Sequence, residues 1–152
     1  MYAIQSNVVD WSEGLGVDGH KIDESRKHLL VIVNRLHTII GMGAAHDDVS
    51  DILCALADYA GAGFLEEERM MSRSYYPEKD DHITQHWVFI ERLSAIIADF
   101  ERGRPVADAA LAFLMHWVAV HVKASDIRFG HYLSPPISWK PIPKRHGAVM
   151  AA

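Results

Sequence analysis

The chain has 152 residues, 49% of them hydrophobic, and a formal net charge of −5 at pH 7. This length suits one globular domain with a real apolar core, and the negative charge argues against nucleic acid, which needs a clustered basic surface. The single cysteine, Cys54, excludes an internal disulfide framework, and we expect it to be packed. No leader is evident and no stretch approaches the roughly 20 apolar residues that cross a bilayer, so we expect a cytoplasmic chain without a membrane partner.

The first half of the chain predicts two helices. Apolar residues recur at helical spacing over residues 22–40, and glycines then break the pattern. A second helix is predicted to start near Asp47 or Asp48, whose carboxylates suit an N-cap, and to run to about Ser74. Pro77 follows it and favours a turn there.

The second half predicts two more helices. The third is expected to begin at Asp80 or Asp81 and to continue until Gly103. The fourth is expected over residues 106–129, with Gly130 as its C-terminal stop. All connectors are short, and no segment has the alternating pattern of a strand.

Four amphipathic helices joined by short loops predict an all-α fold, an antiparallel up-down-up-down four-helix bundle. We expect this bundle, with an N-terminal arm, to occupy residues 1–134. Residues 135–152 contain four of the six prolines and are expected to form a Pro-rich C-terminal tail, with Trp139 as a docking anchor.

Two histidines four residues apart, His82 and His86, carry the strongest chemical signal. On a helix this spacing places both imidazoles on one face, about 6 Å apart, so they can hold one metal ion between them. His121 and Asp126 follow 35 and 40 residues after His86 and can add a third imidazole and a carboxylate from the next helix. On the second helix Glu67 lies on the face marked as buried by its apolar neighbours, so it is a further candidate, with Glu68 beside it.

These residues resemble the hemerythrin-like proteins and, more closely, the bacteriohemerythrins. The family pattern is an early tryptophan, an ID-x-x-H segment ahead of asparagine-leucine, HF-x-x-E, HxxxH and HxxxxD, one motif to each successive helix. This chain has Trp11 followed in order by IDESRKHLLVIVNRL, GFLEEERM, HITQH and HVKASD, with matching separations. The resemblance covers residues 10–133 and implies a non-haem iron site.

The resemblance assigns roles to individual residues. It implies that three histidines bind one iron and that two carboxylates bridge to a second iron: His82, His86, His121, Glu67 and Asp126. The two histidines expected on the second iron are absent, because Arg26 and Gly63 stand at their positions. A guanidinium is permanently charged and hydrogen-bonds carboxylates, so we expect Arg26 to replace the second cation and Gly63 to leave room for it.

Several functions follow from this pattern. The first is a single-metal or degenerate diiron site, with iron favoured and zinc or manganese also suitable, that binds or senses dioxygen or takes part in redox chemistry. Alternatives are an iron enzyme that takes an anionic substrate near Arg26, a complete diiron centre in which His20 folds back as a ligand, and a metal-free bundle. His28 is expected to point away from the site, and His37 to lie too far along the helix. Whether the chain is an enzyme stays open.

Overall fold

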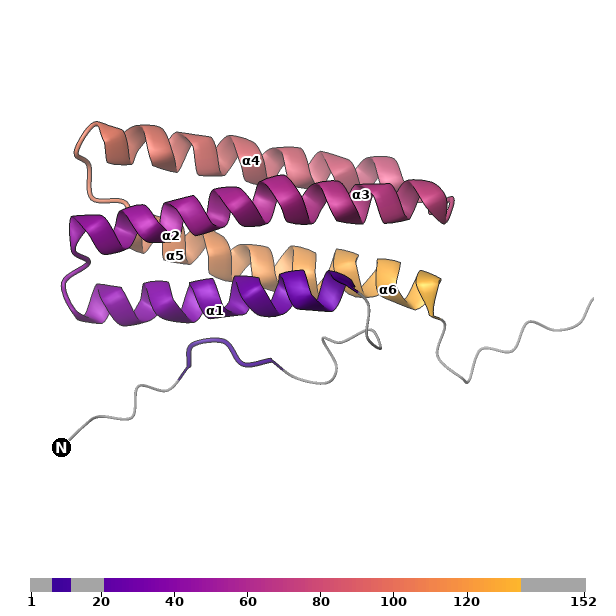
Figure 1. Cartoon of the computed structure of the whole chain (residues 1–152), viewed down its shortest axis with the longest axis horizontal. Helices are drawn as coiled ribbons and strands as arrows, with labels where there is room; N and C mark the ends of the chain where they lie inside the picture. The colour runs from indigo at the N-terminus through magenta and orange to yellow at the C-terminus, as the bar shows by residue number, and fades with distance from the viewer. Residues whose placement is uncertain (1–6, 12–20, 135–152) are drawn as a thin grey trace, which may run out of the picture.

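The computed structural model describes residues 7–11 and 21–134, and this part of the chain is all-α. Four rods lie side by side, and short loops join consecutive rods at alternate ends (Figure 1). The rods are built from these segments: α1 (Lys21–Gly41); α2 (His46–Asp58), η2 (Tyr59–Gly63) and α3 (Phe64–Arg73); α4 (Lys79–Glu101); and α5 (Ala107–Trp117), η3 (Val118–Asp126) and α6 (Ile127–Leu133). The predicted antiparallel four-helix bundle is confirmed.

The predicted helix ends are less accurate than the helices themselves. The second rod begins at His46, so Asp47 and Asp48 lie in its first turn and provide no N-cap hydrogen bond. In α4 the same holds for Asp80 and Asp81. Carboxylates in a first turn still favour the helix, because they lie near the positive end of its dipole.

The prediction that Gly130 ends the fourth helix is wrong. Gly130 lies inside α6 and is buried, and the helix continues to Leu133. The last turn is held from outside, because the Tyr132 hydroxyl donates to the backbone oxygens of Ser74 and Tyr75 at 2.8 and 3.2 Å. Tertiary contacts of this kind outweigh the modest helix penalty of one glycine.

Two of the rods contain π-helical segments, which the sequence did not predict. The second rod changes from α to π geometry at η2 and returns at α3, and the fourth does so at η3. A π turn closes between residues i and i+5, so it rotates everything beyond it relative to an unbroken α-helix. Such segments are frequent at functional sites, and here each one immediately precedes or contains residues of the buried polar cluster described below.

Glycines in the left-handed region form the turns at one end of the bundle. Gly43 has φ +100° after α1, and Gly103 has φ +75° after α4. Neither would bring an added Cβ near another atom, so backbone conformation, and not space, favours glycine at both positions. The backbone N–H of Ala44 donates to the carbonyl of Ile39 at 2.7 Å, which closes the first of these helix ends.

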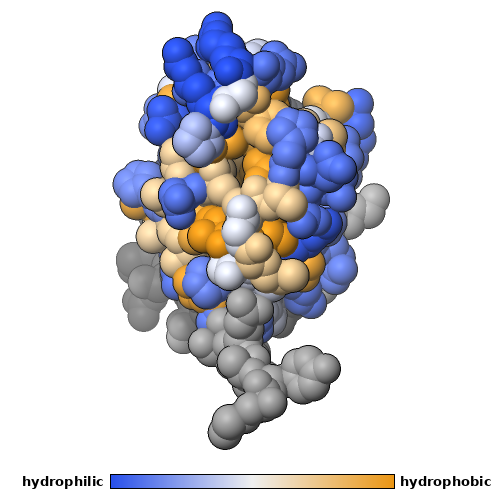
Figure 2. Space-filling view, turned by 90° about the vertical axis from the view of Figure 1, so that its left-hand side faces the viewer, coloured by the Kyte–Doolittle hydropathy of each residue, from blue (hydrophilic) through white to orange (hydrophobic). Residues whose placement is uncertain are grey.

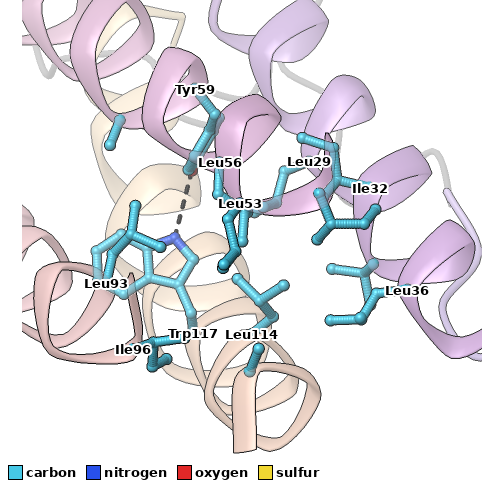
Figure 3. Packing of buried hydrophobic residues seen from close by; sticks show 14 of the residues in the cluster. Leu29, Ile32, Leu36, Leu53, Leu56, Tyr59, Leu93, Ile96, Leu114 and Trp117 are labelled. Atoms are coloured by element: carbon cyan, nitrogen blue, oxygen red, sulfur yellow. Dashed lines mark hydrogen bonds between the residues drawn. The ribbon is translucent and has the colours of Figure 1, made fainter. Parts of the chain in front are cut away.

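The apolar faces of all four rods meet in one core (Figure 3). Leu29 and Leu36 from α1, Leu56 from α2 and Leu114 from α5 are each at most 1% exposed. Complete burial of such a side chain stabilises the fold by about 1.5–3 kcal/mol. A second, smaller apolar cluster is formed by Ile22, Met71, Tyr76 and Phe129.

The described part of the N-terminal arm is fixed to α1 by one side chain. Asn34 accepts hydrogen bonds from the backbone N–H groups of Val8 and Val9 at 2.9 and 3.0 Å and donates to the Val9 carbonyl at 2.6 Å. Val9 is buried in the core, and Trp11 packs against it. The predicted Pro-rich tail, including Trp139, lies outside the described residues.

One surface residue differs from what the sequence suggested. Cys54 is exposed and not packed, because α2 turns Leu53 and Leu56 inward on either side of it. Trp87 is 61% exposed. At the end of the bundle that carries Gly43 and Gly103, a hollow of about 460 Å³ is lined by apolar residues and by the polar side chains of His46, Arg104 and Asp108 (Figure 2). None of the described helices combines the length and apolar character needed to span a membrane.

Candidate metal centre

His82 and His86 both point into the bundle from the first turns of α4. They are 2% and 1% exposed, and their ring centroids lie 4.8 Å apart. The helical spacing of four residues therefore places both rings on one buried face, as predicted. Phe64 of α3 lies parallel to the His86 ring at a centroid distance of 3.9 Å and restricts its rotation.

The π geometry of η3 adds His121 and Asp126 to the same site. On an α-helix, residues five apart are about 140° out of register, so only one of them could face inward. In a π turn residue i+5 follows residue i on the same face, and both side chains are buried here. His121 Nε2 lies 2.8 Å from Asp126 Oδ1, and the His82 and His121 ring centroids are 4.6 Å apart.

Glu67 extends into the cluster from α3, the segment whose rotation about the rod axis is changed by η2. Its Oε1 lies 3.5 Å from His82 Nε2, and its Oε2 lies 3.5 Å from His86 Nε2. One ligand atom from each of Glu67, His82, His86 and His121 falls within 4.8 Å of the others. Asp126 Oδ1 is 3.3 Å from His82 Nε2 and 2.8 Å from His121 Nε2. The structure thus brings together all five residues that the sequence singled out.

A second layer of side chains fixes the orientation of two imidazoles. His86 Nδ1 lies 2.9 Å from Glu68 Oε1, and His121 Nδ1 lies 2.7 Å from Gln85 Oε1. Ser125 Oγ donates to the same Gln85 oxygen at 2.8 Å. Because these oxygens accept, each Nδ1 carries the proton, and each Nε2 presents a lone pair to the centre of the cluster.

The sequence did not identify most of this outer layer. Glu68 was suggested by its position beside Glu67, but Gln85 and Ser125 carried no motif. The signal for Gln85 was its place between His82 and His86, on the side of α4 that faces the fourth rod. Ser125 could have been found from its adjacency to Asp126.

Charge and burial favour the ligand states of His86, His121 and Asp126, whereas Glu67 is shifted toward its protonated form. Burial lowers the pKa of His86 and that of His121, so both imidazoles are neutral near pH 7. Burial alone would raise the pKa of Asp126, but the neighbouring His121, His82 and Arg26 hold it below its usual range. Burial and the charge of Asp126 raise the pKa of Glu67 well above 4.5. A cation at the centre would reverse that rise by attracting the carboxylate.

The inward-facing atoms lack the hydrogen bonds that buried polar atoms normally have. Within the described residues, five buried atoms of the cluster have no hydrogen-bond partner: Glu67 Oε1, His82 Nε2, His86 Nε2, His121 Nε2 and Asp126 Oδ1. Several lie within 3.5 Å of one another but are poorly aligned for hydrogen bonds, as expected for lone pairs aimed at a shared third atom. Each unsatisfied atom costs about 1–3 kcal/mol. The donor set of three imidazoles and two carboxylates therefore fits a divalent transition metal.

Known proteins with similar sequences include hemerythrins. No family model matches the chain. It is 28% identical to a bacteriohemerythrin of Pseudomonas aeruginosa over 116 residues, which are 76% of this chain and 75% of the relative. The chain is thus similar to bacteriohemerythrin over about three quarters of its length. A myohemerythrin of Theromyzon tessulatum is 25% identical over 78% of this chain and 88% of its own, and a hemerythrin-like protein of Naegleria gruberi is 22% identical over 79% and 89%.

This hemerythrin-like bundle has an arginine where the pattern expects a histidine on the first helix. Arg26 is 1% exposed, and its Nε lies 3.3 Å from Asp126 Oδ2. Its Nη2 donates to the Asp126 carbonyl oxygen at 2.9 Å, and its Nη1 lies 3.4 Å from Asp23 Oδ1. The guanidinium is therefore engaged on several sides by groups of the protein itself.

Gly63 occupies the other position where the hemerythrin-like pattern has a histidine. A Cβ added to Gly63 would lie 2.7 Å from Ser25 Oγ, so α1 and the second rod approach closely here. A cavity of about 400 Å³ opens beside this contact. Its lining includes Arg26, Tyr59, Glu67 and Asp126, so it reaches the carboxylate side of the cluster, and none of the three clustered histidines lines it.

The other histidines that the structure describes lie outside the cluster. His28 is exposed at the cavity wall, and His37 is half-buried farther along α1. His46 stacks on Phe100 at a centroid distance of 4.5 Å, at the opposite end of the bundle. His116 and His131 are exposed. His20, considered above as a replacement ligand, lies outside the described residues.

Proposed function

We propose that this hemerythrin-like chain binds one non-haem iron through three imidazoles, with carboxylates completing the ligand set. The proposed ligands are His82, His86, His121, Glu67 and Asp126. The observation that carries this proposal is the convergence of three buried Nε2 atoms and two carboxylate oxygens that have no hydrogen-bond partner among the described residues. The relatives are named bacteriohemerythrin and myohemerythrin, which favours iron over zinc or manganese.

In this proposal Arg26 takes the place of the second cation. Two buried carboxylates without a counter-charge would cost several kcal/mol, and a guanidinium at 3.3 Å from Asp126 supplies that charge at every physiological pH. Its contacts with Asp23 and with the Asp126 backbone anchor it to the protein. The site is therefore complete with one ion, which supports a mononuclear centre over a diiron centre.

A bound ferrous ion would supply reversible binding or one-electron reduction of a small ligand such as dioxygen, nitric oxide or a peroxide. The protein holds the imidazoles of His86 and His121 in one tautomer, and burial excludes bulk water from the Nε2 atoms of all three histidines. The cavity beside Arg26 gives small molecules a route to the carboxylate side of the cluster. We propose an oxygen- or redox-related binding or sensing role on this basis.

The anionic-substrate alternative is less favoured by the contacts. Among the described residues that line the cavity, Arg26 is the one arginine or lysine, and it is already engaged by Asp23 and Asp126. The same lining contains four carboxylates: Asp58, Glu66, Glu67 and Asp126. An anion entering this cavity would meet net negative charge, so a small neutral ligand suits it better.

Metal analysis of the purified full chain tests the proposal. Protein reconstituted anaerobically with ferrous iron and then desalted should retain one iron per chain, and His86→Ala should lose it. The matched control His37→Ala changes a histidine outside the cluster and should keep it. Two firmly bound irons would reject the mononuclear site, and no retained metal would leave the metal-free bundle as the answer.

A further inference from the structure

One of the clustered imidazoles is in contact with a buried tryptophan–tyrosine pair. Trp117 stacks on His121 with a centroid distance of 3.8 Å and an interplanar angle of 10°. Its indole Nε1 donates to the Tyr59 hydroxyl at 3.3 Å, drawn as a dashed line in Figure 3. Both side chains are 6% exposed. The contacts therefore form an unbroken series from His121 through Trp117 to Tyr59.

Packing alone does not require these residue types. His86 is covered by Phe64 in nearly the same way, at 3.9 Å and an angle of 1°. A phenyl ring thus satisfies the steric need beside a clustered imidazole. Indole and phenol differ from phenyl in being readily oxidised by one electron, and the two oxidisable rings contact each other directly.

The series ends at the cavity. Tyr59 is one of the cavity-lining residues, together with Arg26 and Gly63. Its hydroxyl oxygen already accepts from Trp117, so the phenolic proton is left for donation elsewhere. Burial, with the charge of Asp126, raises the pKa of Tyr59, which keeps that proton in place until the ring is oxidised.

We propose that Trp117 and Tyr59 form a one-electron donor to the His121 side of the proposed metal centre, and that they serve in the reduction of peroxide. This inference rests on the single-iron site proposed above. Reduction of H2O2 to two waters consumes two electrons and two protons. A single bound ferrous ion would supply only one of those electrons.

The pair supplies the other electron, and the reaction then balances. Trp117 passes an electron through its contact with His121 and is refilled from Tyr59 across the hydrogen bond. Tyr59 loses its phenolic proton and becomes a neutral radical. That proton and one from solvent join the two oxygen atoms of the cleaved O–O bond as water. A protein donor is needed because Arg26 takes the place of the second metal, and a centre with one metal lacks the second electron that a metal pair would hold.

The experiment uses the iron-loaded full chain. Ferrous protein is mixed anaerobically with one equivalent of hydrogen peroxide, frozen within milliseconds and examined by electron paramagnetic resonance. We expect an organic radical whose hyperfine pattern narrows when the protein carries ring-deuterated tyrosine. Tyr59→Phe should abolish the tyrosyl signal, and Trp117→Phe should abolish it with Tyr59 intact. Trp87→Phe, which alters an exposed tryptophan, and Tyr132→Phe should retain it.

Iron content measured on the same samples separates the possible failures. A wild-type sample that holds iron and consumes peroxide without forming any organic radical overturns the donor role. So does a Trp117→Phe sample that holds iron and forms the tyrosyl radical as wild type does. Loss of iron from the wild-type chain itself would instead overturn the proposed metal site. Unchanged far-UV circular dichroism of each variant establishes that the bundle is folded.

Discussion

Arg26 and Asp126, one hundred residues apart in the chain, are joined twice. The guanidinium Nε lies 3.3 Å from the Asp126 carboxylate, and Nη2 donates to its backbone carbonyl at 2.9 Å. One arginine of the first rod thereby neutralises the carboxylate of η3 and fixes the backbone where η3 passes into α6. In the hemerythrin-like pattern a histidine stands at the position of Arg26, so this contact distinguishes the chain from that pattern.

Replacing Arg26 should destabilise the metal-free protein strongly. Arg26→Met keeps much of the side-chain volume but leaves Asp126 buried without its cation, so the free energy of unfolding should fall by roughly 3–5 kcal/mol. Urea denaturation in the presence of a chelator measures this. The control is Arg35→Met, which removes an exposed ion pair with Asp51 and should cost only about 0–1 kcal/mol. Equal losses in the two variants would contradict a charge-compensating role.

Restoring both histidines should create a second metal position, provided that space is made. Arg26→His with Gly63→His supplies the two imidazoles, but any side chain at Gly63 meets Ser25 Oγ at 2.7 Å. We therefore expect the triple variant that adds Ser25→Ala to bind two irons, and the double variant to bind less. Metal analysis and the visible spectrum of a bridged iron pair report the result. A triple variant that is folded yet still limited to one iron would count against this reading of Arg26.

Gln85 should tune metal affinity without touching the metal. Its Oε1 accepts from His121 and from Ser125, so Gln85→Leu frees the His121 ring and removes the acceptor that fixes its tautomer. Loss of such an outer hydrogen bond lowers metal affinity by about 10–100-fold. Competition with a coloured chelator measures the change. Glu91→Gln, an exposed substitution on the same helix, should leave the affinity unaltered, and a Gln85→Leu protein matching it would show that the tautomer is not controlled from here.

The metal-free protein should become less stable as the pH falls below 6.5. Because burial lowers the pKa of His86 and that of His121 below 6.5, the unfolded chain binds protons in this range that the folded chain does not. Stability therefore rises with pH up to about 6.5. Glu67 acts in the opposite direction, since its raised pKa makes the folded state bind the extra proton above pH 4.5.

Glu67→Gln separates these contributions. The variant removes the opposing group, so its stability should depend more steeply on pH between 4.5 and 6.5 than that of the wild type. Denaturation curves collected across this range provide the measurement, with Glu91→Gln as the exposed control. An unchanged slope in Glu67→Gln would mean that Glu67 is ionised in the folded metal-free protein over this range.

The sequence predicted what depends on local periodicity. The apolar repeats predicted the four rods, and the four-residue spacing of His82 and His86 predicted that the two side chains share one helix face. Both predictions follow from the geometry of a single α-helix. The five-residue spacing of His121 and Asp126 is different. It is incompatible with a shared α-helical face, and only a π segment reconciles it with two buried ligands.

The features that the sequence could not predict depend on contacts between rods. Gln85 meets His121 across 36 residues, and Trp117 meets Tyr59 across 58. Nothing in the residue types alone selects these partners. The prediction for Gly130 was wrong for a related reason, since its local preference to end a helix is overcome by hydrogen bonds from Tyr132 to the turn that follows α3.

The five proposed ligands all project from α3, α4 and η3, and α1 provides none. An ion would therefore crosslink three rods and leave the first connected to them by apolar contacts, by the exposed Arg35–Asp51 ion pair and by the Arg26 guanidinium. Loading with iron should slow amide hydrogen exchange least in α1. We therefore expect α1, together with the arm that Asn34 binds, to be the part of the metal-loaded bundle that opens most readily.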